Sequence, residues 1–163
     1  MSLLGWCQWL QHTFLATTIT ESSWLFPVIE GSHIMALSFS VGLIAIFDLR
    51  LLGLAFRSEP ASTIMKQLAP WSLAGFAVMF VTGLLLFMTQ AGKAYGNAFF
   101  RTKLTFLLLL GINAAVYQLK FYPKMMGWDL AEKTPAGARW CAGLSLVGWA
   151  VVIICGRTMA YEF

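Results

Sequence analysis

The stretch that decides the fold covers residues 24–57 and reads WLFPVIEGSHIMALSFSVGLIAIFDLRLLGLAFR. Most of it is apolar, but Glu30 and His33 stand one helical turn apart, and Asp48 and Arg50 lie near its far end. As a helix, residues 28–47 would rise about 1.5 Å per residue. Their length would then match the thickness of a hydrocarbon core of roughly 30 Å. Ionisable groups are costly there, so they usually face protein or mark a site. The stretch therefore predicts a membrane-spanning helix with a carboxylate and an imidazole in its outer third.

The composition is typical of a membrane protein. Of the 163 residues, 59% are hydrophobic and 11% are charged, whereas a soluble domain is about 25% charged. The net charge of +4 comes from scattered bases, and the chain contains no GxSxG, Walker or GxGxxG motif. These features exclude soluble hydrolases, dehydrogenases and nucleic-acid binders. We expect one membrane domain over residues 1–163.

The first span is expected over residues 24–56, and three more apolar segments follow at residues 70–89, 99–121 and 139–161. Short loops between spans imply antiparallel neighbours. Residues 2–20 are shorter and rich in tryptophan, which favours an amphipathic helix lying in the membrane interface. The predicted fold is all-α, an integral-membrane four-helix up-down bundle with an N-terminal interfacial helix.

Small and polar residues repeat at helical spacing along each span and predict its inner face, because small residues allow close approach of neighbouring helices. The first span has a ridge of small residues beside the face that carries Glu30 and His33. The predicted inner faces, in chain order, are Ser32, Ala36 and Ser40; Ser72, Gly75, Met79, Thr82 and Gly83; Thr102, Thr105, Leu109, Asn113 and Tyr117; and Cys141, Ser145, Gly148 and Cys155.

The distribution of Lys and Arg predicts the orientation in the membrane. One side carries seven bases, Arg50, Arg57, Lys66, Lys120, Lys124, Lys133 and Arg139, and the other carries four, Lys93, Arg101, Lys103 and Arg157. Cytoplasmic loops carry the excess of Lys and Arg. We therefore expect a multi-pass protein of the bacterial inner membrane with both termini in the periplasm.

The ionisable residues fall into two layers by depth. In the outer layer Glu30 has Lys103 and Arg157 as expected cationic partners, either in a structural ion pair or in a site where Glu30 carries protons. In the inner layer Asp48 and Arg50 are expected to form a structural pair at the interface. Asn113 and Arg139 lie at a similar depth to this pair.

His33 is the candidate cofactor-binding residue. A histidine on an inner face is often a hydrogen-bonded core residue, but it can also be an axial ligand of haem b or a polar contact to a quinone. The chain has two histidines, so a pair of histidine ligands to haem iron would be His12 and His33. Met88 is the alternative second ligand, and Glu30 would orient His33 or carry a proton.

The chain contains the segments WLFPVIEGSHIMALSFSVGLIAIFDLRLLGL, GFAVMFVTGLLLF, RTKLTF and GINAAVY. Through them, over roughly residues 20–161, it resembles a family of small four-span bacterial inner-membrane proteins catalogued as a domain of unknown function. The resemblance implies the same bundle and no particular activity, and its matching positions are Glu30, His33, Asp48, Arg50, Lys103 and Asn113. The chain is also more loosely similar to copper-resistance D-type membrane proteins. Where the first family is expected to have a second histidine in the third span, this chain has Gln118.

The predicted function is a small subunit of a membrane redox system that holds haem b or quinone near the periplasmic face through His33. Its partners would be the lipid bilayer and other membrane or periplasmic subunits, or further copies of the chain, without nucleic acid. We expect no enzymatic activity of the chain on its own. The first alternative is a non-catalytic anchor or assembly subunit. The second is transport of a small solute or metal, although no span has the Gly/Pro-interrupted halves of broken transporter helices.

Overall fold

The computed structural model describes residues 3–129 and 134–161, and these residues form helices and their connections without a strand. Four helices are long and apolar enough to cross a membrane, which confirms an all-α multi-pass membrane protein. The helices in chain order are α1 (Leu3–Gln11), α2 (Phe14–Glu21), α3 (Leu25–Leu52), α4 (Ala61–Gly96), α5 (Ala98–Val116), η1 (Tyr117–Phe121), η2 (Tyr122–Gly127) and α6 (Ala136–Tyr161). Lys133, counted above among the cytoplasmic bases, lies outside the described residues.

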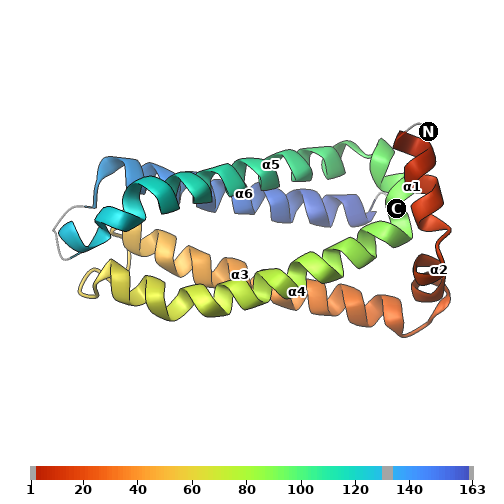
Figure 1. The fold of residues 1–163 in the computed structure, drawn as a ribbon, viewed down its shortest axis with the longest axis horizontal. Helices are drawn as coiled ribbons and strands as arrows, with labels where there is room; N and C mark the ends of the chain where they lie inside the picture. Colours follow the sequence, from red (N-terminus) through yellow and green to blue (C-terminus); the bar gives the residue numbers. More distant parts are fainter. Residues whose placement is uncertain (1–2, 130–133, 162–163) are drawn as a thin grey trace.

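The N-terminal segment forms two short helices where one was expected. The chain breaks at His12 and Thr13, where the Thr13 hydroxyl donates to the Leu10 carbonyl at 2.7 Å and competes with the next helical turn. Helices α1 and α2 lie across one end of the bundle (Figure 1) and pack on α4. They therefore cover the end of the bundle at which α3 begins.

Helix α3 ends four residues earlier than predicted, because Gly53 adopts the left-handed conformation with φ 72°. The Gly53 and Leu54 amides then donate to the Arg50 and Leu49 carbonyls, both at 3.0 Å. Glycine adopts this conformation without the steric cost of a Cβ atom, so it commonly ends helices.

Helix α4 is longer than the predicted second span at both ends. Pro70 lies inside it, and the segment after residue 89, predicted as a loop, remains helical to Gly96. Gln90 has non-helical dihedrals, φ −133° and ψ 22°, and kinks the helix. The third span is also longer than predicted, because α5 continues into the π-helix η1 and the 3-10 helix η2, whose first turn contains Pro123. Proline is tolerated there because the first amides of a helix have no partner within it.

The bundle consists of the α3–α4 pair and the α5–α6 pair, joined mainly where α3 packs on α6. Figure 1 shows both chain ends at one end of the bundle and the α3–α4 and α5–α6 connections at the other. We call these the termini end and the loop end. Two groups of buried side chains fill the core, one around Leu51 and Ala142 toward the loop end and one around Leu110 and Trp149 in the middle.

The predicted inner faces are confirmed on α6 and over the middle of α4, where Cys141, Ser145, Cys155, Ser72 and Thr82 are buried. The small residues also pack as expected: a Cβ atom on Gly75 would lie 2.1 Å from the Ser40 hydroxyl of α3.

The predicted inner face of α5 is wrong in its first half. Thr102, Thr105 and Leu109 are exposed, and α5 instead turns Lys103, Phe106, Leu107 and Leu110 toward the bundle. The threonine hydroxyls donate to the carbonyls of Ala98 and Arg101 in their own helix. They therefore need no partner inside the bundle, and a threonine on this helix is no sign of its inner face.

Candidate functional site

A polar group lies in the termini half of the bundle with one member from each spanning helix. We call it the His33 cluster, and it consists of His33 of α3, Thr82 of α4, Lys103 of α5 and Cys155 of α6. His33 bonds Thr82 directly, and Lys103 interacts electrostatically with both His33 and Cys155. His33 and Lys103 are half-buried, whereas Thr82 and Cys155 are buried. The cluster thus joins four helices that the sequence alone could not orient relative to one another.

The hydrogen bonds of His33 indicate its tautomer. Its Nδ1 lies 3.0 Å from the Thr82 hydroxyl oxygen, and that hydroxyl donates its single proton to the Val78 carbonyl at 2.7 Å. With that proton engaged, the Thr82 oxygen accepts a hydrogen bond from Nδ1–H. A neutral imidazole has one donor and one acceptor nitrogen. Nε2 of His33 is then the acceptor, and it has no hydrogen-bond partner among the described residues.

Gly83 explains why His33 can approach α4 so closely. A Cβ atom at Gly83 would lie 3.0 Å from Cε1 and 3.5 Å from Nδ1 of the imidazole. The ring thus packs against the helix backbone, and a Cβ atom at Gly83 would be in tight contact with it. Because α4 has Thr82 and Gly83 in sequence, one residue orients the ring and the next makes room for it.

Lys103 crosses from α5 toward α6. Its Nζ atom lies 3.6 Å from the place where a Cβ atom on Gly156 would be. Lysine can bury its apolar stem along neighbouring helices while its ammonium group finds polar surroundings. Lys103 is thus a cation within electrostatic reach of His33 inside the bundle, and it would favour an anion or a polar ligand bound there.

The structure does not show the ion pair predicted for Glu30. Glu30 is half-buried, Arg157 is exposed, and Lys103 instead faces His33 and Cys155. Within the described residues, neither Lys103 nor Arg157 comes within 4.0 Å of the Glu30 carboxylate. The rotation of α5 described above accounts for this, because Lys103 belongs to the face that turns toward α6.

Neither of the predicted second ligands lies beside His33. His12 is exposed at the break between α1 and α2, and its neighbour Gln11 accepts from the Gly92 amide at 3.2 Å. Gly92 lies about 15 Å beyond Thr82 along α4, from the helical rise per residue. Met88 lies about two thirds of a turn around α4 from Thr82. The residues described contain no group of three or more His, Cys, Asp or Glu side chains that could hold a metal ion.

The predicted Asp48–Arg50 pair does not form either, although both side chains are 5% exposed. Residues two apart on a helix point to different sides. Arg50 donates from Nε to the Glu59 carbonyl at 2.7 Å and from Nη2 to the Asp129 carbonyl at 3.2 Å. It thereby ties both connections at the loop end together, while Asp48 faces α6 and η1.

The other predicted residues near Asp48 have structural or surface positions. Asn113 donates to the Cys141 carbonyl at 2.9 Å and links α5 to α6. Arg139 is exposed and forms no ion pair among the residues that the structure describes.

Asp129 has a structural role that no pattern in the sequence predicts. Its carboxylate accepts from the Ser62 amide at 2.7 Å and from the Ser62 hydroxyl. Ser62 lies in the first turn of α4, where amides have no partner within the helix and a negative charge is favourable. The sequence does not predict this cap, because Asp129 and Ser62 are 67 positions apart in the chain.

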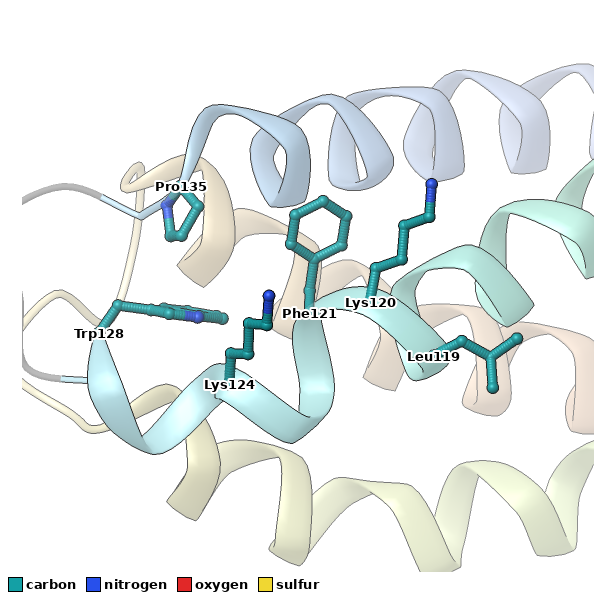
Figure 2. Close-up of a pocket in the computed structure, with 6 residues that line it drawn as sticks. All are labelled: Leu119, Lys120, Phe121, Lys124, Trp128 and Pro135. Atoms are coloured by element: carbon teal, nitrogen blue, oxygen red, sulfur yellow. The ribbon is translucent and has the colours of Figure 1, made fainter.

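A wide hollow of about 480 Å³ opens at the loop end beside η1 and η2, lined by Leu119, Lys120, Phe121, Lys124, Trp128 and Pro135. Figure 2 shows Lys124 pointing into the space between Trp128 and Phe121. Lysine and tryptophan are typical of the membrane–water interface. The hollow therefore fits the interfacial position of this end of the bundle and lies away from the His33 cluster.

Comparison with known proteins identifies the chain at the level of its family. No curated protein and no solved structure matches it significantly. One family, described as "Family of unknown function (DUF6644)", matches residues 6–162. The match covers nearly the whole chain, all four spanning helices included. The chain therefore belongs to this family of unknown function.

Proposed function

We propose that this protein is an integral-membrane subunit of an electron-transfer system that binds the headgroup of a quinol or quinone at the His33 cluster. One observation carries the proposal: Nδ1 of His33 is held by Thr82, whereas Nε2 has no partner among the described residues. A pre-oriented, unused acceptor beside a cation is suited to a ligand that presents an O–H group and can lose its proton. A quinol headgroup has this chemistry.

Each residue of the His33 cluster would have its own role in binding the headgroup. Nε2 of His33 would accept the hydrogen bond of a quinol hydroxyl, and the Lys103 ammonium would stabilise negative charge on that oxygen. Thr82 and Gly83 would keep the imidazole in place without touching the ligand. The isoprenoid tail would lie in the bilayer, and the centres that exchange electrons with the headgroup would belong to a partner subunit.

Haem b is the second candidate ligand. An imidazole whose Nδ1 is held and whose Nε2 is unused is the arrangement found in metal-ligating histidines. Haem with two axial ligands would also need a second side chain, and neither His12 nor Met88 lies beside His33. A quinol contact needs only His33 and Lys103, so the geometry favours it.

The proposed orientation places the His33 cluster in the periplasmic half of a bacterial inner membrane. The loop end carries more bases than the termini end, and the excess of Lys and Arg is typical of the cytoplasmic side. Figure 1 shows that both chain ends lie at the opposite end, which would then be periplasmic. Quinols diffuse within the bilayer, so a site in either half is accessible to them.

The test measures binding of a short-chain quinol analogue to the purified protein by quenching of tryptophan fluorescence. We expect His33→Ala to weaken binding about tenfold, because a lost buried hydrogen bond costs about 1.4 kcal/mol. His12→Ala is the matched control, since this exposed histidine should leave affinity unchanged. Wild-type protein that binds no quinol analogue would contradict the proposal, and haem absorption in that protein would favour the second candidate instead.

A non-catalytic anchor is the alternative function, and one feature of the bundle favours it. Helices α4 and α5 are consecutive but make few contacts with each other. They leave large apolar side chains on their outer faces, such as Phe80 and Leu108, which are 72% and 66% exposed. A partner helix could pack there. In that case His33→Ala would leave partner binding intact, whereas Phe80→Ala would weaken it.

A further inference from the structure

A second polar group lies in the loop half of the bundle, and the quinol proposal makes no use of it. Its central residue is Asp48, which is 5% exposed. The Oδ2 atom of Asp48 is buried and has no hydrogen-bond partner in the described structure. No cation compensates the carboxyl group, because Arg50 is turned toward the carbonyls of Glu59 and Asp129.

Tyr117 is the second member of this group. It is 7% exposed, and its hydroxyl is also buried without a partner among the described residues. Phe47 meets its ring edge-on at a centroid distance of 5.7 Å, and Phe121 stacks on it at 6.1 Å. Tyr117 is the first residue of the π-helix η1, and single π-helical turns are frequent at functional sites.

Helix α6 completes the group with Ser145, which is buried and whose side chain interacts with the Asp48 carboxyl group. Asp48 also interacts electrostatically with Tyr117 and with the Cys141 thiol of α6. Three helical segments therefore direct polar side chains to one buried place. We call Asp48, Tyr117 and Ser145 the Asp48 cluster.

Three physical points decide what this cluster can hold. A charged carboxylate without a cation is very costly in low dielectric surroundings, whereas a neutral acid is tolerated. Two buried oxygens without partners in one place can be joined by a bound water. A calcium or magnesium ion would need about six oxygen ligands, more than one carboxyl group and two hydroxyls supply.

We propose that the Asp48 cluster is an intramembrane proton-binding site, in which Asp48 is a neutral acid and one water links its Oδ2 to the Tyr117 hydroxyl. Asp48 takes this proton from solvent when the chain folds. It releases the proton when the site opens to solvent or when the pH is strongly alkaline. The site is independent of the His33 cluster, and the two proposals can fail separately.

The surroundings of Asp48 contain few groups that would titrate with it. Its own helix presents Arg50, which is bound to backbone carbonyls at the loop end. The segment η1 presents Tyr117, α6 presents Cys141, and Tyr117 is also influenced by Asp129 and Tyr122. Apart from Arg50, whose guanidinium group is bound to those carbonyls, the titratable neighbours are anions or neutral groups near neutral pH, so they do not favour an ionised Asp48.

The experiment is infrared spectroscopy of the full-length protein in lipid nanodiscs, with heavy carbon at the side-chain carboxyl of aspartate. The chain has two aspartates, so the label reports only Asp48 and Asp129. We expect one protonated-acid band from Asp48 and one carboxylate band from Asp129, which accepts from Ser62. Because this measurement needs no mutation, it does not depend on whether a variant folds.

Variants then assign the acid band. Asp48→Asn should abolish it, Tyr117→Phe should shift it by removing the bridging partner, and the matched control Tyr122→Phe, at an exposed residue, should leave it unchanged. The wild-type band should disappear only at high pH. If both labelled aspartates absorb as carboxylates at neutral pH, the proposal is wrong. A spectrum that changes with sodium at constant pH would indicate a metal ion and would also overturn it.

Discussion

Thr82 uses both hydrogen-bonding capacities of its hydroxyl, and this makes it the residue that orients His33. The hydroxyl donates to the Val78 carbonyl of its own helix and accepts from His33 Nδ1 of α3. A threonine in a membrane helix normally satisfies itself through the preceding turn. Here the lone pairs left over are used to bind a second helix and to select one tautomer of the imidazole.

At this scale we predict the effect of Thr82→Val, which keeps the shape of the side chain and removes the acceptor of His33 Nδ1. The free energy of unfolding should fall by about 1 kcal/mol, the usual contribution of one buried hydrogen bond. Quinol-analogue affinity should fall as well, because the ring is no longer held. Thermal unfolding in detergent and fluorescence quenching measure the two effects.

Thr105→Val is the matched control for this prediction. Thr105 is exposed, and its hydroxyl donates only to the Arg101 carbonyl of its own helix. We expect a change within about 0.5 kcal/mol, as for other surface positions. Equal effects of the two substitutions would show that Thr82 has no special role in holding His33.

At the scale of elements, the contact between α3 and α4 is the most extensive among the described helices. Small residues allow it at two levels, Gly75 against Ser40 and Gly83 against His33. Membrane helices associate largely through such close packing, since burial of apolar surface drives little association within lipid. The α3–α4 pair is therefore the platform on which Thr82 and His33 meet.

We predict that Gly75→Ala destabilises this pair. The new Cβ atom would lie 2.1 Å from the Ser40 hydroxyl, and Ser40 is fully buried. Overpacking of this kind costs about 1–3 kcal/mol, measurable by thermal unfolding in detergent. Adding Ser40→Ala should restore part of the loss, because it removes the atom that clashes.

Gly111→Ala is the control for a glycine within a spanning helix, since a Cβ atom there meets nothing within 4 Å. It should leave stability unchanged or raise it by up to about 1 kcal/mol, through the better helix propensity of alanine. A loss at Gly111 as large as that at Gly75 would mean that close approach of α3 and α4 is not the cause.

At the scale of the whole molecule, the two ends of the bundle differ in chemistry. The loop end holds Arg50 and its backbone acceptors, the Asp129 cap of α4 and the hollow lined by Lys120, Lys124 and Trp128. The termini end is covered by α1 and α2, which carry exposed tryptophans such as Trp6 and Trp9. This asymmetry supports a fixed orientation in the membrane.

We predict that the loop end is cytoplasmic, and cysteine labelling with a membrane-impermeant maleimide tests this. The native Cys7, Cys141 and Cys155 are buried, so a new exposed cysteine gives the main signal. Ser58→Cys, in the α3–α4 connection, should react in inside-out vesicles but not in intact spheroplasts. Gly96→Cys, at the opposite end, should react in spheroplasts, and the reverse pattern would invert the proposed topology.

The sequence by itself determined the four spans, because the length and hydrophobicity of a segment are local properties, and they decide whether it can cross the bilayer. It also determined the inner faces of α6 and the middle of α4, where small residues repeat at helical spacing. It missed the ends of α3, α4 and α5: α3 ends at a left-handed Gly53, α4 continues through a kink at Gln90 to Gly96, and a π-helix follows Val116. These are choices of backbone conformation that apolar runs do not encode.

Only the tertiary structure decided which polar groups meet. The sequence placed Glu30, His33 and Lys103 at one depth, and Asp48 near Arg50, but depth does not specify how each helix is rotated about its axis. That rotation, set by packing along the whole length of each helix, turns Lys103 toward His33 and Cys155. It also leaves Asp48 with Ser145 and Tyr117 while Arg50 reaches the loops. A pairing between helices depends on distance and direction in space, and a single sequence carries neither.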